Sequence, residues 1–236
     1  MNAMRMNTMN TQKRWFRMLS AVLLALLFAT CIPSGAQAAS RWKTLQNKYL
    51  DKKSVNCLIF VKYTGGTKCE VLVYRKAKKA NGKYTWKQKL RCNGYVGLEG
   101  IGKMREGDMR TPIGVFKPTE AFGILDNPGT ALKYTKLNPY LYWSGEWGTY
   151  NTMVDSRVLG HIPADSEHLI SISPHYNYAI NIGYNPDNIY WEGSAIFLHC
   201  FGYNPYTGGC VAISQKNMKT VLRTITKKTR VCIYEK

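Results

Sequence analysis

The chain has 236 residues, a formal net charge of +19 at pH 7 and an apolar fraction of 45%. This length and apolar content suffice for one ordinary domain with a single core. The basic residues are scattered and accompany no recognisable nucleic-acid-binding module, so a nucleic-acid partner is not expected. No internal repeat or low-complexity tract is present in the sequence.

The first 38 residues have the pattern of an export signal. Residues 18–32 form an apolar run, and Ala36-Gln37-Ala38 supplies the small side chains of a cleavage site. Four basic residues and no acidic one precede the apolar run: Arg5, Lys13, Arg14 and Arg17. The pattern predicts a secretory signal peptide over residues 1–38. Because the apolar run is short for a bilayer, no stable membrane span is expected after cleavage, and an uncleaved anchor is the alternative.

Cleavage after residue 38 removes four positive charges and leaves a net charge of +15. Such a surface favours encounters with polyanions, and for an exported protein the expected polyanions are anionic cell-wall polymers. The expected location is therefore secreted or associated with the cell wall. We assign residues 39–53 to a polar lead-in and residues 54–236 to one domain.

Short apolar or alternating runs, separated by turn residues, predict a strand-rich domain. Thr64-Gly65-Gly66-Thr67 is a good hairpin turn between the first two runs. A helix is predicted from about residue 215 to residue 227, with Ser214 as its cap. The predicted class is mainly β, an antiparallel sandwich or barrel with one late packed helix. The expected strands cover residues 55–63, 68–74, 83–92, 114–117, 168–173, 178–184, 194–200 and 230–234.

The most informative spacing joins His199 and Cys210. An apolar run ends at His199, a turn-rich loop follows, and Gly208 and Gly209 directly precede the cysteine. A thiol needs a base or a cationic neighbour to form its thiolate near neutral pH, and a histidine can supply that base. The glycines would let a substrate carbonyl reach backbone N–H groups that receive an oxyanion. The alternative is a buried cysteine and a strand-end histidine that never meet.

Five further cysteines follow the predicted signal: Cys57, Cys69, Cys92, Cys200 and Cys232. If Cys210 is a working thiol, these five cannot all pair. Two bridges with one free thiol fit the count, and so does an absence of bridges. Cysteines in strand-like stretches often act as small apolar residues.

Asp108, Glu167 and His168 are weaker candidates. Asp108 precedes Thr111-Pro112, and these residues either shape a substrate groove or form a polar turn fixed by the proline. Glu167 and His168 either orient substrate or His199, or face solvent at the start of a strand.

Three histidines, His161, His168 and His175, are spaced by seven residues, which raises the possibility of a metal site. Pro163 and Pro174 break any helix that would align them, and the ligand set is incomplete, so no metal is predicted. The aromatic side chains between residues 134 and 150 either line a sugar or peptide groove or pack on the core.

Several segments, in this order, together resemble the L,D-transpeptidase catalytic domains of the YkuD-like family. The first is the Gly107-Asp108 block, which continues through Thr111-Pro112 and Gly114 to Phe116 and matches the pattern Gly-Asp-x-x-Thr-Pro-x-Gly-x-Phe. Later blocks are Ser166-Glu-His-Leu169, residues 178–185, Gly193-Ser-Ala-Ile-Phe-Leu-His199 and Gly209-Cys-Val-Ala212. The resemblance covers roughly residues 54–236.

The resemblance implies a function for the His199–Cys210 spacing. Cys210 matches the nucleophile and His199 its base, and no cofactor is implied. Such enzymes act on peptidoglycan stem peptides: the cysteine attacks the carbonyl of a diamino acid, D-alanine leaves, and a thioester remains. A side-chain amine of a second stem peptide then forms a 3→3 cross-link.

The chain departs from the common family pattern around Cys210. Gly208 stands where a second histidine is common, and Ala212 where an Arg or Asn is common. The departures indicate a divergent Gly-Gly-Cys-Val-Ala branch that keeps the catalytic pair, and they leave open the acceptor and the choice between transfer and carboxypeptidase-like hydrolysis. A separate alternative is a wall-binding module on the same scaffold without turnover.

Overall fold

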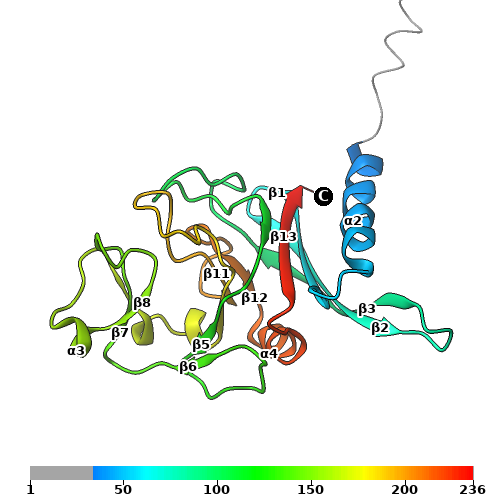
Figure 1. The fold of residues 1–236 in the computed structure, drawn as a ribbon. Coiled ribbons are helices and arrows are strands. Elements are labelled where there is room, and N and C mark those ends of the chain that lie inside the picture. The colour runs from blue at the N-terminus through cyan, green and yellow to red at the C-terminus, as the bar shows by residue number, and fades with distance from the viewer. Residues whose placement is uncertain (1–33, 236) are drawn as a thin grey trace, which may run out of the picture. The chain divides into compact units, whose positions relative to one another are not determined.

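A computed structural model describes residues 34–235 (Figure 1). The basic and apolar parts of the predicted signal peptide, residues 1–33, lie outside the described residues. None of the helices within residues 34–235 is long and apolar enough to cross a membrane. The elements are α2 (Ser34–Leu50), β1 (Cys57–Gly65), β2 (Lys68–Lys78), β3 (Tyr84–Tyr95), β4 (Gly114–Phe116), β5 (Ala121–Gly123), β6 (Tyr134–Lys136), β7 (Leu141–Trp143), β8 (Met153–Asp155), α3 (Ser156–Leu159), β9 (Glu167–His168), β10 (Ala179–Asn181), β11 (Phe197–Cys200), β12 (Val211–Ile213), α4 (Gln215–Thr224) and β13 (Thr229–Glu235).

The predicted mainly β class is confirmed, and most of its strands belong to one ten-stranded sheet. The strand order is β4-β13-β1-β2-β3-β12-β11-β10-β5-β6. The sheet is mixed, whereas the sequence analysis expected antiparallel pairing: β1 with β13, β5 with β6, and β11 with β12 are parallel. A tight turn in the sequence predicts that the two strands beside it pair as an antiparallel hairpin. The parallel pairs are joined by longer connections, which contain no local sequence signal for the pairing. The predicted turn between β1 and β2 is present.

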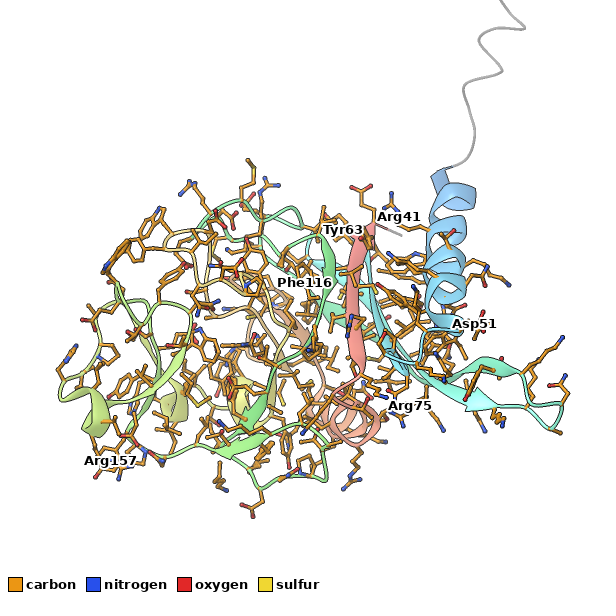
Figure 2. The ribbon with its side chains drawn as sticks, in the orientation of Figure 1. Arg41, Asp51, Tyr63, Arg75, Phe116 and Arg157 are labelled. Carbon is orange, nitrogen blue, oxygen red and sulfur yellow. The ribbon has the colours of Figure 1, made fainter. Side chains whose placement is uncertain are left out.

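A second, three-stranded antiparallel sheet has the order β8-β7-β9. Arg157 of the short helix α3 lies at one end of this part of the fold (Figure 2), with its guanidinium 4.2 Å from the Tyr140 ring centroid. The strand predicted over residues 168–173 is wrong beyond His168, because Leu169–Ser171 forms a 3₁₀ turn. Leu169 is fully buried in that turn. Burial of this one side chain accounts for an apolar pattern that resembles a strand.

The central strands bury apolar side chains on both faces. Along β1, Cys57, Ile59 and Val61 enter one core cluster, and Leu58 and Phe60 enter another. The α4 helix covers the first face with Met218, Val221 and Leu222, as its apolar spacing predicted. Trp42 and Leu45 pack into the second cluster, with the Trp42 ring 5.0 Å from Phe60. Part of the segment predicted as a polar lead-in is therefore core. Burial of each such side chain stabilises by about 1.5–3 kcal/mol.

The α4 helix starts where the sequence predicted. Ser214 has an extended backbone, and its Oγ accepts the N–H of Asn217 at 3.3 Å. The helix ends at Thr224, three residues earlier than predicted, because Ile225 has an extended backbone and its buried side chain joins the core. This short helix connects β12 to β13 and so fixes the path of the chain after Cys210 (Figure 1).

The N-cap gives a direct test of this description. Ser214→Ala should lower the free energy of unfolding by about 1 kcal/mol, because the Asn217 N–H loses its side-chain acceptor. Urea unfolding followed by circular dichroism measures the change. Ser156→Ala, at the first residue of α3 where Asp155 provides the cap, is the matched control. Equal stability of the Ser214 variant and the parent would contradict the capping role.

Candidate active site

His199 and Cys210 are brought together by the parallel pairing of β11 with β12. His199 pairs with Ala212, and paired residues on neighbouring strands point to the same face. Cys210 lies two residues before Ala212 and therefore shares that face. The division of the cores agrees: Leu198 and Val211 enter one cluster, and Cys210 enters the other together with Phe197. Both His199 and Cys210 line one cavity of about 420 Å³.

Cys210 is held as a neutral thiol. Cys210 is buried, with 8% of its surface exposed. Its thiol donates a hydrogen bond to the Ala195 carbonyl oxygen, 3.1 Å from Sγ. The Phe197 N–H donates to the same sulfur at 3.2 Å. Burial raises the pKa of the Cys210 thiol to about 12, against the lowering effect of the Phe197 N–H. A buried thiolate is costly, so the sulfur keeps its proton in the unliganded site.

His199 is held as a neutral imidazole of defined tautomer. Its Nδ1 lies 2.7 Å from the Cys200 carbonyl oxygen. A carbonyl only accepts hydrogen bonds, so Nδ1 carries the proton and Nε2 keeps a free lone pair. Burial lowers the pKa of His199 to about 4. Within residues 34–235 no hydrogen bond joins this ring to the Cys210 sulfur; the pair rests as imidazole and thiol, not as an ion pair.

The Cys210 backbone is fixed by two buried threonines. Thr207 and Thr111 both donate from Oγ1 to the Cys210 carbonyl, at 2.7 Å and 3.1 Å. Thr111 Oγ1 also accepts the N–H of Gly97 at 2.9 Å. The Thr-Pro part of the sequence block around Asp108 therefore acts through the nucleophile candidate's own backbone, a link that the sequence alone did not reveal.

The two glycines before Cys210 have different environments. Gly209 has φ +143°, and a Cβ there would lie 2.9 Å from the Arg110 carbonyl oxygen, so the position requires glycine. Its N–H donates to Thr207 Oγ1 at 3.1 Å and is already used. Gly208 lies on the cavity wall, and its N–H has no hydrogen-bond partner among residues 34–235. Of the two, Gly208 is the better placed to contact a ligand.

Asp108 organises the loop that carries Thr111. Its carboxylate accepts the N–H groups of Met104, Arg105 and Arg110 and binds Lys103 Nζ at 3.0 Å. Burial alone would raise its pKa, but these hydrogen bonds outweigh burial and lower the pKa of Asp108 to about 2. A carboxylate so fully occupied is a structural anchor. Its interactions match the polar-turn interpretation.

Glu167 and His175 line the same cavity as Cys210. The Glu167 carboxylate accepts the O–H of Tyr176 at 2.5 Å. The His175 ring centroid lies 5.6 Å from that of His199, and its Nδ1 is a buried nitrogen without a hydrogen-bond partner among residues 34–235. Glu167 was one of the weaker candidates from the sequence; His175 entered only as one of the spaced histidines. Only the folded chain brings these segments to Cys210.

The other two spaced histidines lie away from the cavity lining. His161 binds Glu146 at 2.9 Å, and the His168 ring stacks on Tyr142 at 4.6 Å. Among the aromatic residues between positions 134 and 150, Trp143 and Tyr150 line the cavity. The six cysteines after the predicted signal are present as free thiols, and all except Cys92 are buried.

A comparison with protein families identifies the domain. The model for YkuD, the L,D-transpeptidase catalytic domain, matches residues 69–233. This span runs from β2 into β13 and includes Thr111, Glu167, His199 and Cys210. A search of curated proteins found no match to the chain.

The protonation state of Cys210 predicts its reactivity. Alkylation of Cys210 by iodoacetamide should accelerate about tenfold per pH unit from about pH 6 to about pH 9, because the thiolate fraction grows at that rate below a pKa of about 12. Peptide mass spectrometry distinguishes alkylation at Cys210 from alkylation at Cys92. Cys92 is the internal control, and burial raises the pKa of its thiol to about 11. A rate that levels off near neutral pH would instead reveal a preformed thiolate.

The threonine beneath Cys210 predicts a stability effect. Thr111→Val should cost about 1–3 kcal/mol of unfolding free energy, since it leaves the buried Gly97 N–H without its acceptor. Thr119→Val, at an exposed threonine of the same region, is the matched control for the change in side-chain chemistry. Chemical denaturation measures both, and equal stabilities would refute the role given to Thr111.

Proposed function

Because this chain belongs to the family of L,D-transpeptidase catalytic domains, we propose that it is a cysteine acyltransferase acting on peptidoglycan stem peptides. The observation that carries the proposal is the cavity shared by a proton-bearing Cys210 thiol and a His199 Nε2 with a free lone pair. A thiol and a base on one wall are the minimum that a thioester mechanism requires.

In the first half of the reaction, Cys210 attacks the carbonyl of a diamino acid that precedes a terminal D-alanine. His199 Nε2 takes the thiol proton as the carbon–sulfur bond forms, and then gives it to the amide nitrogen that leaves as D-alanine. The products are a thioester on Cys210 and a neutral His199. We assign Gly208 to the oxyanion side, in place of the Gly208–Gly209 pair that the sequence suggested, since its N–H is free of other partners.

The neutral resting pair determines when charge appears. Burial disfavours both the thiolate and the imidazolium, as the shifted pKa values of Cys210 and His199 express. The proton therefore moves as the sulfur attacks, with the substrate already excluding water from the site. A site of this kind is protected from oxidation and alkylation until substrate binds.

In the second half, an amine or a water molecule resolves the thioester. A side-chain amine of a second stem peptide gives a 3→3 cross-link, and water gives a tripeptide, the carboxypeptidase outcome. We favour transfer, because the cavity wall carries the carboxylate of Glu167, which suits a cationic amine. A wall-binding module without turnover is the third outcome that the test must separate.

We further propose that the protein works outside the cytoplasm, at the cell wall. The basic and apolar pattern of residues 1–38 supports export, and the mature charge of +15 favours retention among anionic wall polymers.

The test uses a purified disaccharide tetrapeptide and the mature protein. Wild type should release D-alanine and form a cross-linked dimer; Cys210→Ala should do neither, and His199→Gln should release D-alanine about 10²–10⁴ times more slowly. Cys232→Ala, which removes a buried thiol of a different core cluster, is the matched control. Binding of the wild type to sacculi without any D-alanine release would favour the wall-binding module and overturn the enzymatic proposal.

A further inference from the structure

In the second half of the proposed reaction, the acceptor ammonium must lose two protons, and His199 can accept only one of them. A side-chain amine with a pKa of about 10.4 is an ammonium near neutral pH, with roughly 4 in 10,000 molecules uncharged at pH 7. When the ammonium becomes an amide it loses two protons. One proton returns to the Cys210 sulfur through His199, and the other needs a second base. Water as acceptor carries no such surplus.

Glu167 is placed to be that second base. It pairs with Trp143 across β9 and β7 and lines the cavity that contains Cys210 and His199. Among the carboxylates on that wall, Glu167 is the one whose charge adds to the effect of burial in raising the pKa of the Cys210 thiol. The Trp143 ring packs at 4.8 Å on Phe197, whose N–H binds the Cys210 sulfur, so both groups belong to one packed unit.

The Glu167 carboxylate is oriented and has room for a ligand. Its Oε2 accepts the Tyr176 O–H, while its Oε1 has no partner among residues 34–235. Tyr176 is buried with 4% of its surface exposed, and burial raises its pKa well above the usual value, so it remains a donor. The residue as a whole is half-buried, but its carboxylate is buried deeply enough for its pKa to be raised. The cavity that Glu167 lines is therefore the path by which its proton would leave.

Two other charged groups of the cavity, Glu106 and Lys103, are less suited to the task because they already have partners. Glu106 Oε2 already accepts the O–H groups of Tyr150 and Ser194, and Lys103 is paired with Asp108. Burial raises the pKa of Glu167 to about 7, against the lowering effect of the Tyr176 hydrogen bond. A base performs best when its pKa is close to the working pH. The other titratable groups that line this cavity with Glu167 and Tyr176 are Lys103, Glu106, Tyr150, Asp165, His175, His199, Tyr206 and Cys210.

We propose that Glu167 binds the ammonium group of the acceptor and removes its first proton, which directs the thioester toward transfer. The inference rests on the proposed acyltransferase function. In the balanced step, the amine nitrogen forms a bond to the thioester carbon and the carbon–sulfur bond breaks. One nitrogen proton goes to Glu167, the second goes through His199 to the Cys210 sulfur, and the third remains on the new amide. Glu167 then loses its proton to water.

Glu167→Gln tests this role through the ratio of cross-linked dimer to tripeptide, measured with the disaccharide tetrapeptide as donor and acceptor. The ratio should fall at least about tenfold at pH 7, because hydrolysis needs only His199. In wild type the ratio should rise with pH and level off above about pH 7, where Glu167 is ionised. In the variant it should keep rising about tenfold per unit toward pH 9, following the free amine.

Hydroxylamine, which is uncharged near neutral pH, separates a catalytic from a structural effect. With hydroxylamine as acceptor, the variant should recover a wild-type ratio of transfer to hydrolysis. Asp126→Asn, at an exposed carboxylate paired with Lys136, is the matched control and should match wild type with both acceptors. An unchanged ratio in Glu167→Gln, or a loss that hydroxylamine does not restore, would overturn the role of Glu167.

Tyr176→Phe provides a second, nearly isosteric variant. It keeps the carboxylate but removes the hydrogen bond that lowers the pKa of Glu167, so the pH at which the ratio levels off should shift upward. An unshifted profile would contradict the proposal. Wild-type protein that releases no D-alanine would instead show that the acyltransferase function itself is wrong, which keeps the two failures distinct.

Discussion

The register between β11 and β12 is the constraint on which the site depends. Side chains alternate along a strand, so a slip of one residue would turn Cys210 away from the cavity and into the opposite core. The register is secured by what lies on that opposite face, where Leu198 and Val211 are fully or almost fully buried. Packing that has no chemical role thus sets His199 and Cys210 on one wall.

Uncharged hydrogen bonds hold the reactive groups in place. The Cys200 carbonyl fixes the His199 tautomer, and Thr111 and Thr207 fix the Cys210 backbone. Such contacts cost less to bury than ion pairs. The His199 contact also leaves Nε2 with a free lone pair. The ion pair of Asp108 with Lys103 contributes indirectly, because it stabilises the loop that positions Thr111. In the proposed mechanism charge is generated by the reaction and is not stored in the resting site.

The sequence predicted the parts of this protein whose causes are local. The α4 cap, the β1–β2 turn and the apolar run of β1 follow from residues within a few positions of one another, as does the His199–Cys210 spacing. Parallel pairing and the cavity walls depend on contacts between distant segments. Glu167 and His175 line the cavity of Cys210 because β9 of the small sheet and a 3₁₀ turn over His175–Asn177 place them there. These contacts join distant segments and have no local sequence pattern. The strand prediction beyond His168 was wrong because the apolar pattern there reflects the burial of Leu169 in a 3₁₀ turn.

The location of the acyl group tests the central claim most directly. Wild-type protein mixed with the disaccharide tetrapeptide would be quenched in acid within the first turnovers, digested and mapped by mass spectrometry. The account predicts a tripeptide-bearing adduct on the peptide that contains Cys210, accompanied by an equal amount of free D-alanine. Release of D-alanine with no adduct on Cys210, or with an adduct on another residue, would contradict it.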